Sequence, residues 1–82
     1  MIIYVKMFGI AKEIFDGESY KLAYNFSENL SVGTVRMILE DAKPELQKLG
    51  SYLVAVNNEY ASTEQLVTEN DEVAIVPPVS GG

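Results

Sequence analysis

One segment of this chain carries a long helical pattern, and it limits the folds that the rest of the chain can form. Ser31 is a suitable N-cap, because its hydroxyl can accept from backbone N–H groups two or three residues later. Lys43 precedes Pro44, which pushes it out of the helical region and ends the helix. The apolar residues between them recur at helical spacing and form a single stripe: Val32, Val35, Ile38, Leu39 and Ala42. Gly33 interrupts this stretch at a cost of roughly 1 kcal/mol relative to alanine.

Two stretches before the helix alternate in the manner of strands. In residues 2–8, the side that should face the core carries Ile3, Val5 and Met7, and the other side carries Tyr4, Lys6 and Phe8. Residues 20–26 alternate in the same way. The link between these stretches allows a helical turn over residues 11–15 and a tight turn at Asp16-Gly17. The two strands are therefore predicted to form a hairpin-like pair.

Shorter elements are expected directly after the helix. Residues 44–48 suit a second short helix, because proline is favoured at a first helical position. Residues 53–56 form a short apolar strand. Asn57-Asn58 tolerates positive φ and predicts a tight turn into a short return strand over residues 59–61.

The last part of the chain returns to the core. Leu66 and Val67 are expected to lie in a loop and to pack into the core from there. Residues 72–76 form the final strand, with Val73 and Ile75 in the core. Pro77-Pro78 then ends its hydrogen bonding, because neither ring nitrogen carries a donor.

This order of elements predicts an α+β fold in which a mixed sheet of four or five strands packs on one main helix. Because a single helix cannot cover both faces of such a sheet, one face should be partly open. Phe8 and Val76 belong to the side opposite the expected core residues, and we place Tyr60 with them. An exposed apolar patch of this kind usually marks a partner-binding site. Isolated surface hydrophobes are also common, and both interpretations stay open at this point.

The chain has neither cysteine nor histidine, which excludes many catalytic and metal sites. Disulfides, thiolate nucleophiles, iron–sulfur clusters and zinc–thiolate sites all need cysteine. A Ser-His-Asp triad and an imidazole base or metal ligand need histidine. Carboxylates, lysine and tyrosine alone would have to carry a reaction, so we expect neither autonomous catalysis nor a bound metal.

The charge of the chain limits the classes of partner that we expect, and its apolar runs limit the expected cellular location. The net charge is −6 and the pI is near 4.4, which disfavours nucleic acid and anionic membranes, because both attract basic surfaces. The negative charge either complements a partner's basic docking surface or only keeps the protein soluble. No apolar run approaches the ~20 residues of a membrane helix, and residues 1–6 fit a strand better than a signal peptide. We therefore expect a cytoplasmic protein.

The sequence closes on Gly81-Gly82 behind a stem of Pro77, Pro78, Val79 and Ser80. Glycines make this end thin and pliable, whereas the prolines stiffen the stem. A terminal carboxylate has a reference pKa of about 3.3–3.7, so it is ionised and unreactive at neutral pH. Any chemistry there requires activation by another protein. We predict a folded domain over residues 1–77 and a flexible tail over residues 78–82; the alternative is a frayed terminus without a role.

Three segments of the chain resemble the MoaD family, the small subunits of molybdopterin synthase. The most specific is the ending, residues 71–82, which reads Asp-Glu-Val-Ala-Ile-Val-Pro-Pro-Val-Ser-Gly-Gly. The other two are residues 53–57 and residues 7–13. The resemblance spans the whole chain and implies the ubiquitin-like β-grasp fold, which agrees with the order of elements.

The resemblance implies a protein that other enzymes use as a substrate. An adenylating enzyme related to ubiquitin-activating proteins would spend ATP to convert the Gly82 carboxylate into an acyl-adenylate. A sulfur donor would then give a thiocarboxylate. The large subunit of molybdopterin synthase would receive the tail residues Pro78, Val79, Ser80 and Gly81, and the sulfur would build a dithiolene on a pyranopterin precursor. The family also implies a heterotetramer of two small and two large subunits, with no cofactor bound by this chain.

Three rival functions remain at the level of sequence. A sulfur carrier of the thiamine type would share the Gly-Gly ending, but such chains are typically shorter and lack the Pro-Pro-Val-Ser stem. A ubiquitin-like modifier would be activated in the same way and would then form isopeptide bonds with lysines. A pure interaction domain would not depend on Gly81-Gly82 at all.

Overall fold

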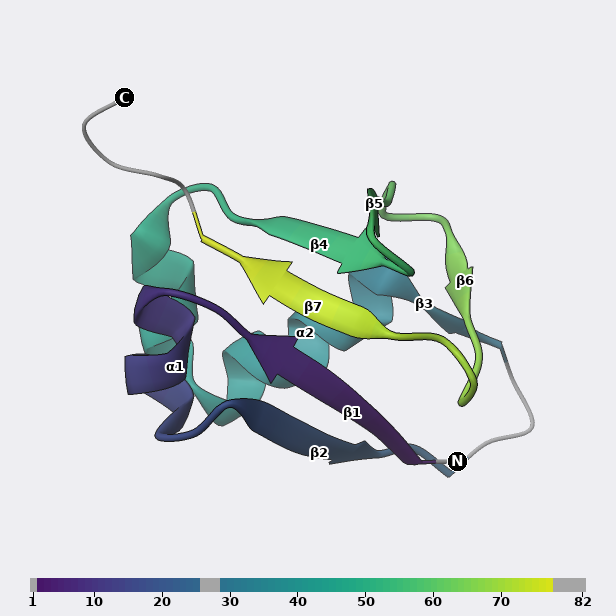
Figure 1. Ribbon diagram of the computed structural model, residues 1–82, viewed down its shortest axis with the longest axis horizontal. Coiled ribbons are helices and arrows are strands. Elements are labelled where there is room, and N and C mark those ends of the chain that lie inside the picture. Colours follow the sequence, from purple (N-terminus) through teal and green to yellow (C-terminus); the bar gives the residue numbers. More distant parts are fainter. Residues whose placement is uncertain (1, 26–28, 78–82) are drawn as a thin grey trace.

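The computed structural model describes residues 2–25 and 29–77. Five strands form one mixed sheet in the order β2-β1-β7-β4-β5, and Figure 1 shows this sheet as one layer. The strands are β1 (Ile2–Met7), β2 (Ser19–Ala23), β4 (Leu53–Val56), β5 (Glu59–Tyr60) and β7 (Val73–Val76). The central pair β1 and β7 is parallel, whereas the other neighbours are antiparallel. The predicted α+β class and ubiquitin-like β-grasp are confirmed.

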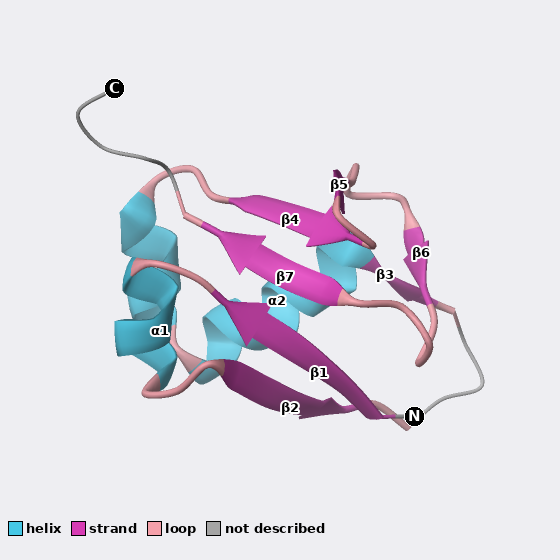
Figure 2. Cartoon of the chain, in the orientation of Figure 1, coloured by secondary structure: helices cyan, strands magenta, loops and turns pink. Residues whose placement is uncertain are grey.

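The helices form the second layer. The main helix is α2 (Val32–Ala42), as the apolar stripe predicts, and two shorter ones are α1 (Ile10–Phe15) and the 3-10 helix η1 (Pro44–Leu49). Figure 2 shows the helices behind the sheet and at one of its ends, which leaves the other face of the sheet without a covering helix. In residues 2–25 and 29–77, none of these helices is long and apolar enough to cross a membrane.

The core lies between the sheet and the helices and is built from alternate strand residues. The sheet contributes Ile3, Val5, Met7, Leu22, Val54, Val56, Val73 and Ile75. The main helix contributes Val32, Val35 and Leu39, and Ile38 packs against them while partly exposed. Ala11, Phe15 and Leu46 close the end of the core. The sides of β1 and β7 that were expected to face the core are therefore the buried ones.

Two expectations about side chains are wrong. Ala42 is exposed, although it continues the apolar stripe of the main helix. Leu66 is 53% exposed, and only Val67 enters the core. These residues form strand β6 (Leu66–Val67), which pairs with β3 (Leu30–Ser31) in a small second sheet, so the segment is not a simple loop. For Leu66 and Val67 the strand geometry explains why only one of them is buried, because adjacent strand residues point to opposite sides.

The first turn of α2 is capped from two directions. The Thr34 N–H donates to the Ser31 hydroxyl at 3.2 Å, as the N-cap interpretation predicts. The N–H groups of Val32 and Gly33 donate to the carbonyls of Gln65 and Thr63, both at 2.9 Å. The loop that contains Thr63 and Gln65 must approach the start of α2 closely to accept these two hydrogen bonds. A Cβ built on Gly33 would lie 2.7 Å from Thr63 Cγ2, so an alanine here would force the Thr63 side chain to shift.

We expect Gly33→Ala to lower the free energy of unfolding by about 1 kcal/mol, because the clash outweighs the gain in helix propensity. Chemical denaturation measures the change. The matched control is Gly33→Ala with Thr63→Ser, which removes the clashing methyl group and should restore stability at least to that of the parent. A single variant more stable than the parent would contradict the close-approach argument.

A cluster around Tyr52 holds the segment before β4 against α2. The buried Tyr52 hydroxyl donates to Glu40, and Gln47 Nε2 donates to the other Glu40 oxygen at 3.2 Å. The Arg36 guanidinium carbon lies 4.3 Å from the centroid of the Tyr52 ring. Burial and the bond to Glu40 raise the pKa of Tyr52 above its usual value. The cluster fixes the chain directly before Leu53, where β4 begins.

This shift gives a pH prediction. Because the pKa of Tyr52 is higher in the folded chain than the ~10 of an unfolded tyrosine, its stabilising effect is complete below about pH 10 and is lost as the pH rises further. Tyr52→Phe should lower the free energy of unfolding by about 1–2 kcal/mol at pH 7. The decline of that free energy above pH 10 should be shallower than in the parent. Urea unfolding of the parent and of the variant at pH 7, 10 and 11 tests both expectations. If the free energy of unfolding falls equally steeply above pH 10 in the two chains, the raised pKa is not that of Tyr52.

Candidate functional site

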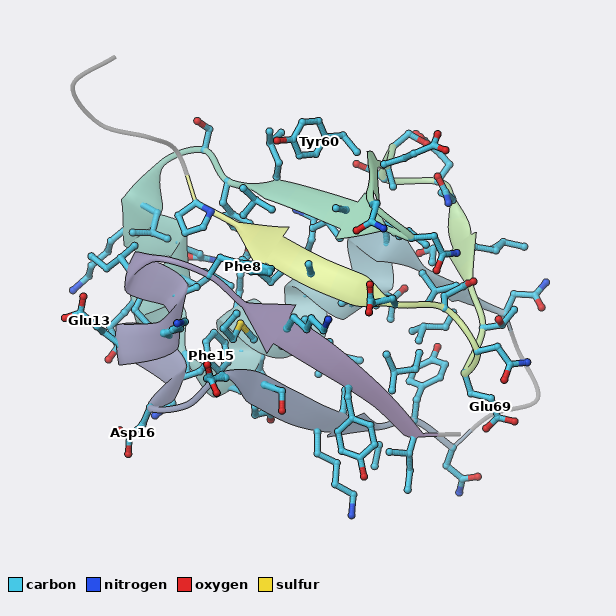
Figure 3. All side chains as sticks on the ribbon, viewed as in Figure 1. Phe8, Glu13, Phe15, Asp16, Tyr60 and Glu69 are labelled. Atoms are coloured by element: carbon cyan, nitrogen blue, oxygen red, sulfur yellow. The ribbon has the colours of Figure 1, made fainter. Side chains whose placement is uncertain are left out.

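The open face of the sheet carries the exposed apolar residues that the sequence predicts. Phe8 follows β1 and is 46% exposed, and Tyr60 in β5 is 67% exposed. Val76 ends β7 and is partly buried. Figure 3 shows Phe8 where β1 ends and Tyr60 beyond β4. The structure thus places all three on the open face, while their role in binding stays a prediction.

The strand register joins these residues into one patch. Val76 is the register partner of Leu53 in β4, and the Phe8 N–H donates to the carbonyl of Ile75 at 3.3 Å. Tyr60 is the register partner of Ala55, two residues beyond Leu53 on the same side of β4. Neighbouring strands lie about 4.8 Å apart, so Val76 lies beside Leu53, and Tyr60 lies diagonally across from Leu53. We call Phe8, Leu53, Tyr60 and Val76 the open-face patch.

Leu53 belongs to this patch although the sequence interpretation did not single it out. Its side chain is 48% exposed, while Val54 and Val56 in the same strand are buried. A run of four apolar residues gives no contrast from which to assign faces. The signal was the strand period: once Val54 and Val56 are assigned to the core, Leu53 must point to the open face.

The charges on this face differ from those of the chain as a whole. Lys6 occupies an outward position of β1 and pairs with Ser19 in the register. Lys21 occupies an outward position of β2 and pairs with Tyr4. Lys6 Nζ lies 2.9 Å from a carboxylate oxygen of Glu72. The net negative charge of the chain therefore does not gather on the outward strand positions, and a basic partner surface is not required there.

A hollow of about 360 Å³ opens beside Phe8. It is lined by Lys6, Met7, Phe8, Lys12, Glu18 and Ser19. The lining thus includes one aromatic residue and two lysines, and Lys12 Nζ lies 3.8 Å from a carboxylate oxygen of Glu18. Such a depression at the rim of an apolar patch suits a protruding side chain of a partner.

The patch lies where the C-terminal segment leaves the domain. Val76 is a member of the patch, and Pro77 is the last residue that the structure describes. The predicted tail residues Pro78, Val79, Ser80, Gly81 and Gly82 lie outside the described residues. Among those that are described, no group of three or more acidic side chains gathers where it could hold a metal ion.

Comparison with known proteins gives the chain its family. The ThiS family model matches residues 5–82. The molybdopterin synthase sulfur carrier subunit of Dictyostelium discoideum is 36% identical over 81 residues, which cover 95% of this chain and 93% of that protein.

Solved structures share the fold. Small archaeal modifier protein 1 of Methanosarcina acetivorans has a TM-score of 0.79 at 25% identity, with 99% of this chain and 96% of that chain covered. A chain from the complex of subunits 1 and 2 of the molybdopterin-converting factor of Helicobacter pylori has a TM-score of 0.67 at 24% identity, with both chains fully covered. The family model and the Dictyostelium relative confirm the resemblance to the MoaD family, and the chain belongs to the ThiS family.

Proposed function

We propose that this chain is the sulfur carrier of a molybdopterin synthase and that the Gly82 carboxylate is the group that carries sulfur. The observation that supports this most strongly is the 36% identity to the Dictyostelium sulfur carrier subunit over 95% of the chain. The same relative favours molybdopterin synthase over the thiamine-type carrier. The absence of cysteine and histidine agrees with a chain whose reactive group is its own terminus.

The chemistry has three steps in this proposal. An adenylating enzyme transfers AMP from ATP to the Gly82 carboxylate, and pyrophosphate leaves. A sulfur donor then displaces AMP and leaves a thiocarboxylate, which is a better nucleophile than the carboxylate. In the large subunit the thiocarboxylate sulfur forms a bond to carbon of the pyranopterin precursor, and water then cleaves the bond between this sulfur and the Gly82 carbonyl carbon, which regenerates the carboxylate. ATP belongs to the activating enzyme, so this chain holds no cofactor of its own.

The open-face patch is the proposed docking surface for the large subunit and for the activating enzyme. Phe8, Leu53, Tyr60 and Val76 offer a continuous apolar area next to the base of the tail. Five residues from Pro78 to Gly82 reach at most roughly 16 Å. A partner seated on the patch can therefore receive the terminus in a pocket within that distance. A heterotetramer with two large subunits and a cytoplasmic location are parts of the same proposal.

A second candidate is a ubiquitin-like modifier, which the similarity to the archaeal modifier favours. Activation would begin in the same way, but a lysine amine would accept the acyl group. The two functions differ in their product. A sulfur carrier gains one sulfur in place of one oxygen, whereas a modifier becomes part of a larger conjugate.

Intact-mass spectrometry tests the proposal. The chain is incubated with a cognate activating enzyme, ATP and a sulfur source, and the expected product is heavier by the difference between sulfur and oxygen. The matched control lacks Gly81 and Gly82 and should stay unmodified. An unchanged mass for the full chain would contradict the proposal, and conjugates of high mass would favour the modifier.

A further inference from the structure

Strand β2 forms an open edge of the five-stranded sheet. It stands first in the order of strands, and among the residues that the structure describes no strand pairs with its outer side. Figure 2 shows β2 at the outer margin of the sheet. The opposite edge, β5, has only two residues, whereas β2 has five and pairs with β1 without a bulge. Proteins usually shorten, bulge or cover their edge strands, and β2 shows none of these features.

The hydrogen-bond pattern shows which backbone groups face this edge. The Met7 N–H donates to the Glu18 carbonyl at 2.9 Å, and these two residues continue the register of β1 and β2 by one step. In an antiparallel pair, opposite residues alternate between those that exchange hydrogen bonds and those that do not. The outer edge therefore presents the N–H and carbonyl groups of three residues: Ser19, Lys21 and Ala23. Within residues 2–25 and 29–77, no other backbone hydrogen bond reaches these groups.

The side chain in the middle of this edge is basic and has no acidic partner. Lys21 is exposed, and neither of the two ion pairs in the described part of the chain includes it. If the β2 strands of two copies paired through all three edge residues, Lys21 would lie opposite Lys21 of the other copy. Like charges directly opposite one another destabilise a strand pair. The charge therefore disfavours a second copy at this edge and favours a segment that carries a carboxylate.

A hollow lies at each end of this edge. The hollow of about 360 Å³ beside Phe8 includes Ser19 in its lining, so it joins the open-face patch to the start of β2. A second hollow, of about 240 Å³, is lined by Ile2, Ala23, Tyr24 and Asn25. Alternate side chains of a strand point to the same face. Three alternate side chains of an added strand would therefore lie near the first hollow, Lys21 and the second hollow.

We propose that the large subunit, seated on the open-face patch, adds an extended segment to the free edge of β2 and places a carboxylate side chain next to Lys21. This inference rests on the proposed function and adds to it a contact made by the backbone of the sheet. In strand addition, main-chain hydrogen bonds supply affinity, and the side chains at alternate positions supply selectivity. The hollow beside Phe8 makes this contact continuous with the open-face patch.

Amide hydrogen exchange of the chain, alone and saturated with the large subunit, tests the proposal residue by residue. The amides of Ser19, Lys21 and Ala23 should exchange at least about tenfold more slowly in the complex, because each donates to the added strand. The amide of Tyr20 is the internal control, since it faces β1 and is already protected in the free chain. Contacts through side chains alone would not protect every second residue.

Three substitutions of Lys21 separate the charge from the backbone. Lys21→Ala removes the charge and should weaken binding of the large subunit about two- to fivefold, and Lys21→Glu should weaken it about tenfold. Lys21→Pro also removes the outward N–H while it leaves the ladder to β1 intact, so it should bind about tenfold more weakly than Lys21→Ala. Calorimetry measures the dissociation constants, and thermal melts check the fold.

The matched control for the charge is Lys48→Glu. Lys48 is exposed on η1, so this variant has the same net charge as Lys21→Glu and should bind within about twofold of the parent.

The outcomes separate the two claims. A parental chain that does not bind the large subunit contradicts the proposed function. If the parent binds and the three amides exchange as fast as in the free chain, or if Lys21→Pro binds as tightly as Lys21→Ala, the strand addition is overturned. Protection of these amides that rises with the concentration of the free chain identifies a second copy as the occupant and also overturns it. If Lys21→Pro does not fold, amide exchange of the parent decides.

Discussion

A chain with one alanine added after Gly82 is expected to lose sulfur loading, with a rate at least about 10²-fold below that of the parent. The addition moves the carboxylate outward by one residue, about 3.3 Å, and brings a Cβ to a position that the proposal reserves for a thin glycine. Intact mass after incubation with the activating enzyme, ATP and a sulfur source measures the loss.

The matched control for this prediction carries the extra alanine at the N-terminus. It has the same composition as the extended chain and leaves Gly82 in its place, so it should be loaded at the parental rate. Loading of the C-terminally extended chain at that rate would show that the position of the carboxylate does not matter, and the proposed role of Gly82 would then be wrong.

Phe8→Asp is expected to weaken binding to the large subunit by about 30-fold or more, the effect of losing an interface residue worth 2 kcal/mol. The change places a charge at the β1 edge of the open-face patch, next to Val76. Isothermal calorimetry with the large subunit measures the dissociation constant, and a thermal melt of the variant checks that the domain stays folded.

The control for this variant is Met37→Asp. Met37 lies on α2 in the helix layer and is 70% exposed, so it receives the same charge on a residue that is at least as accessible. Its dissociation constant should stay within about twofold of that of the parent, as expected for a residue outside the interface. Equal affinities for the Phe8 variant and the parent would remove the open-face patch as the docking surface.

The main elements of the fold could be predicted because their residues repeat with clear periods. The stripe from Val32 to Leu39 and the alternation in β1 both match the buried residues. The small sheet of β3 and β6 could not be predicted, because strands of two residues carry no period. Ala42 was misplaced because a residue as small as alanine costs little when it is exposed at the end of a helix.

The candidate site was only partly accessible from the sequence. Phe8 and Val76 could be placed on the open face because Phe8, directly after β1, and Val76, at the end of β7, are each out of phase with the core residues of those strands. Leu53 could not be placed on the open face in this way, because all four residues of its strand are apolar. Gly9 and Pro77 lie near one another although they are 68 positions apart in the sequence, because the parallel pairing of β1 with β7 places the ends of the two strands side by side.

The most direct test of the central claim follows the sulfur through one complete cycle. The loaded chain is purified, mixed with the large subunit and the pyranopterin precursor, and followed by intact mass over time. The account predicts that the mass returns to that of the unmodified chain while a dithiolene forms on the pterin. A loaded chain that keeps its sulfur, or that appears in conjugates with lysine, would contradict it.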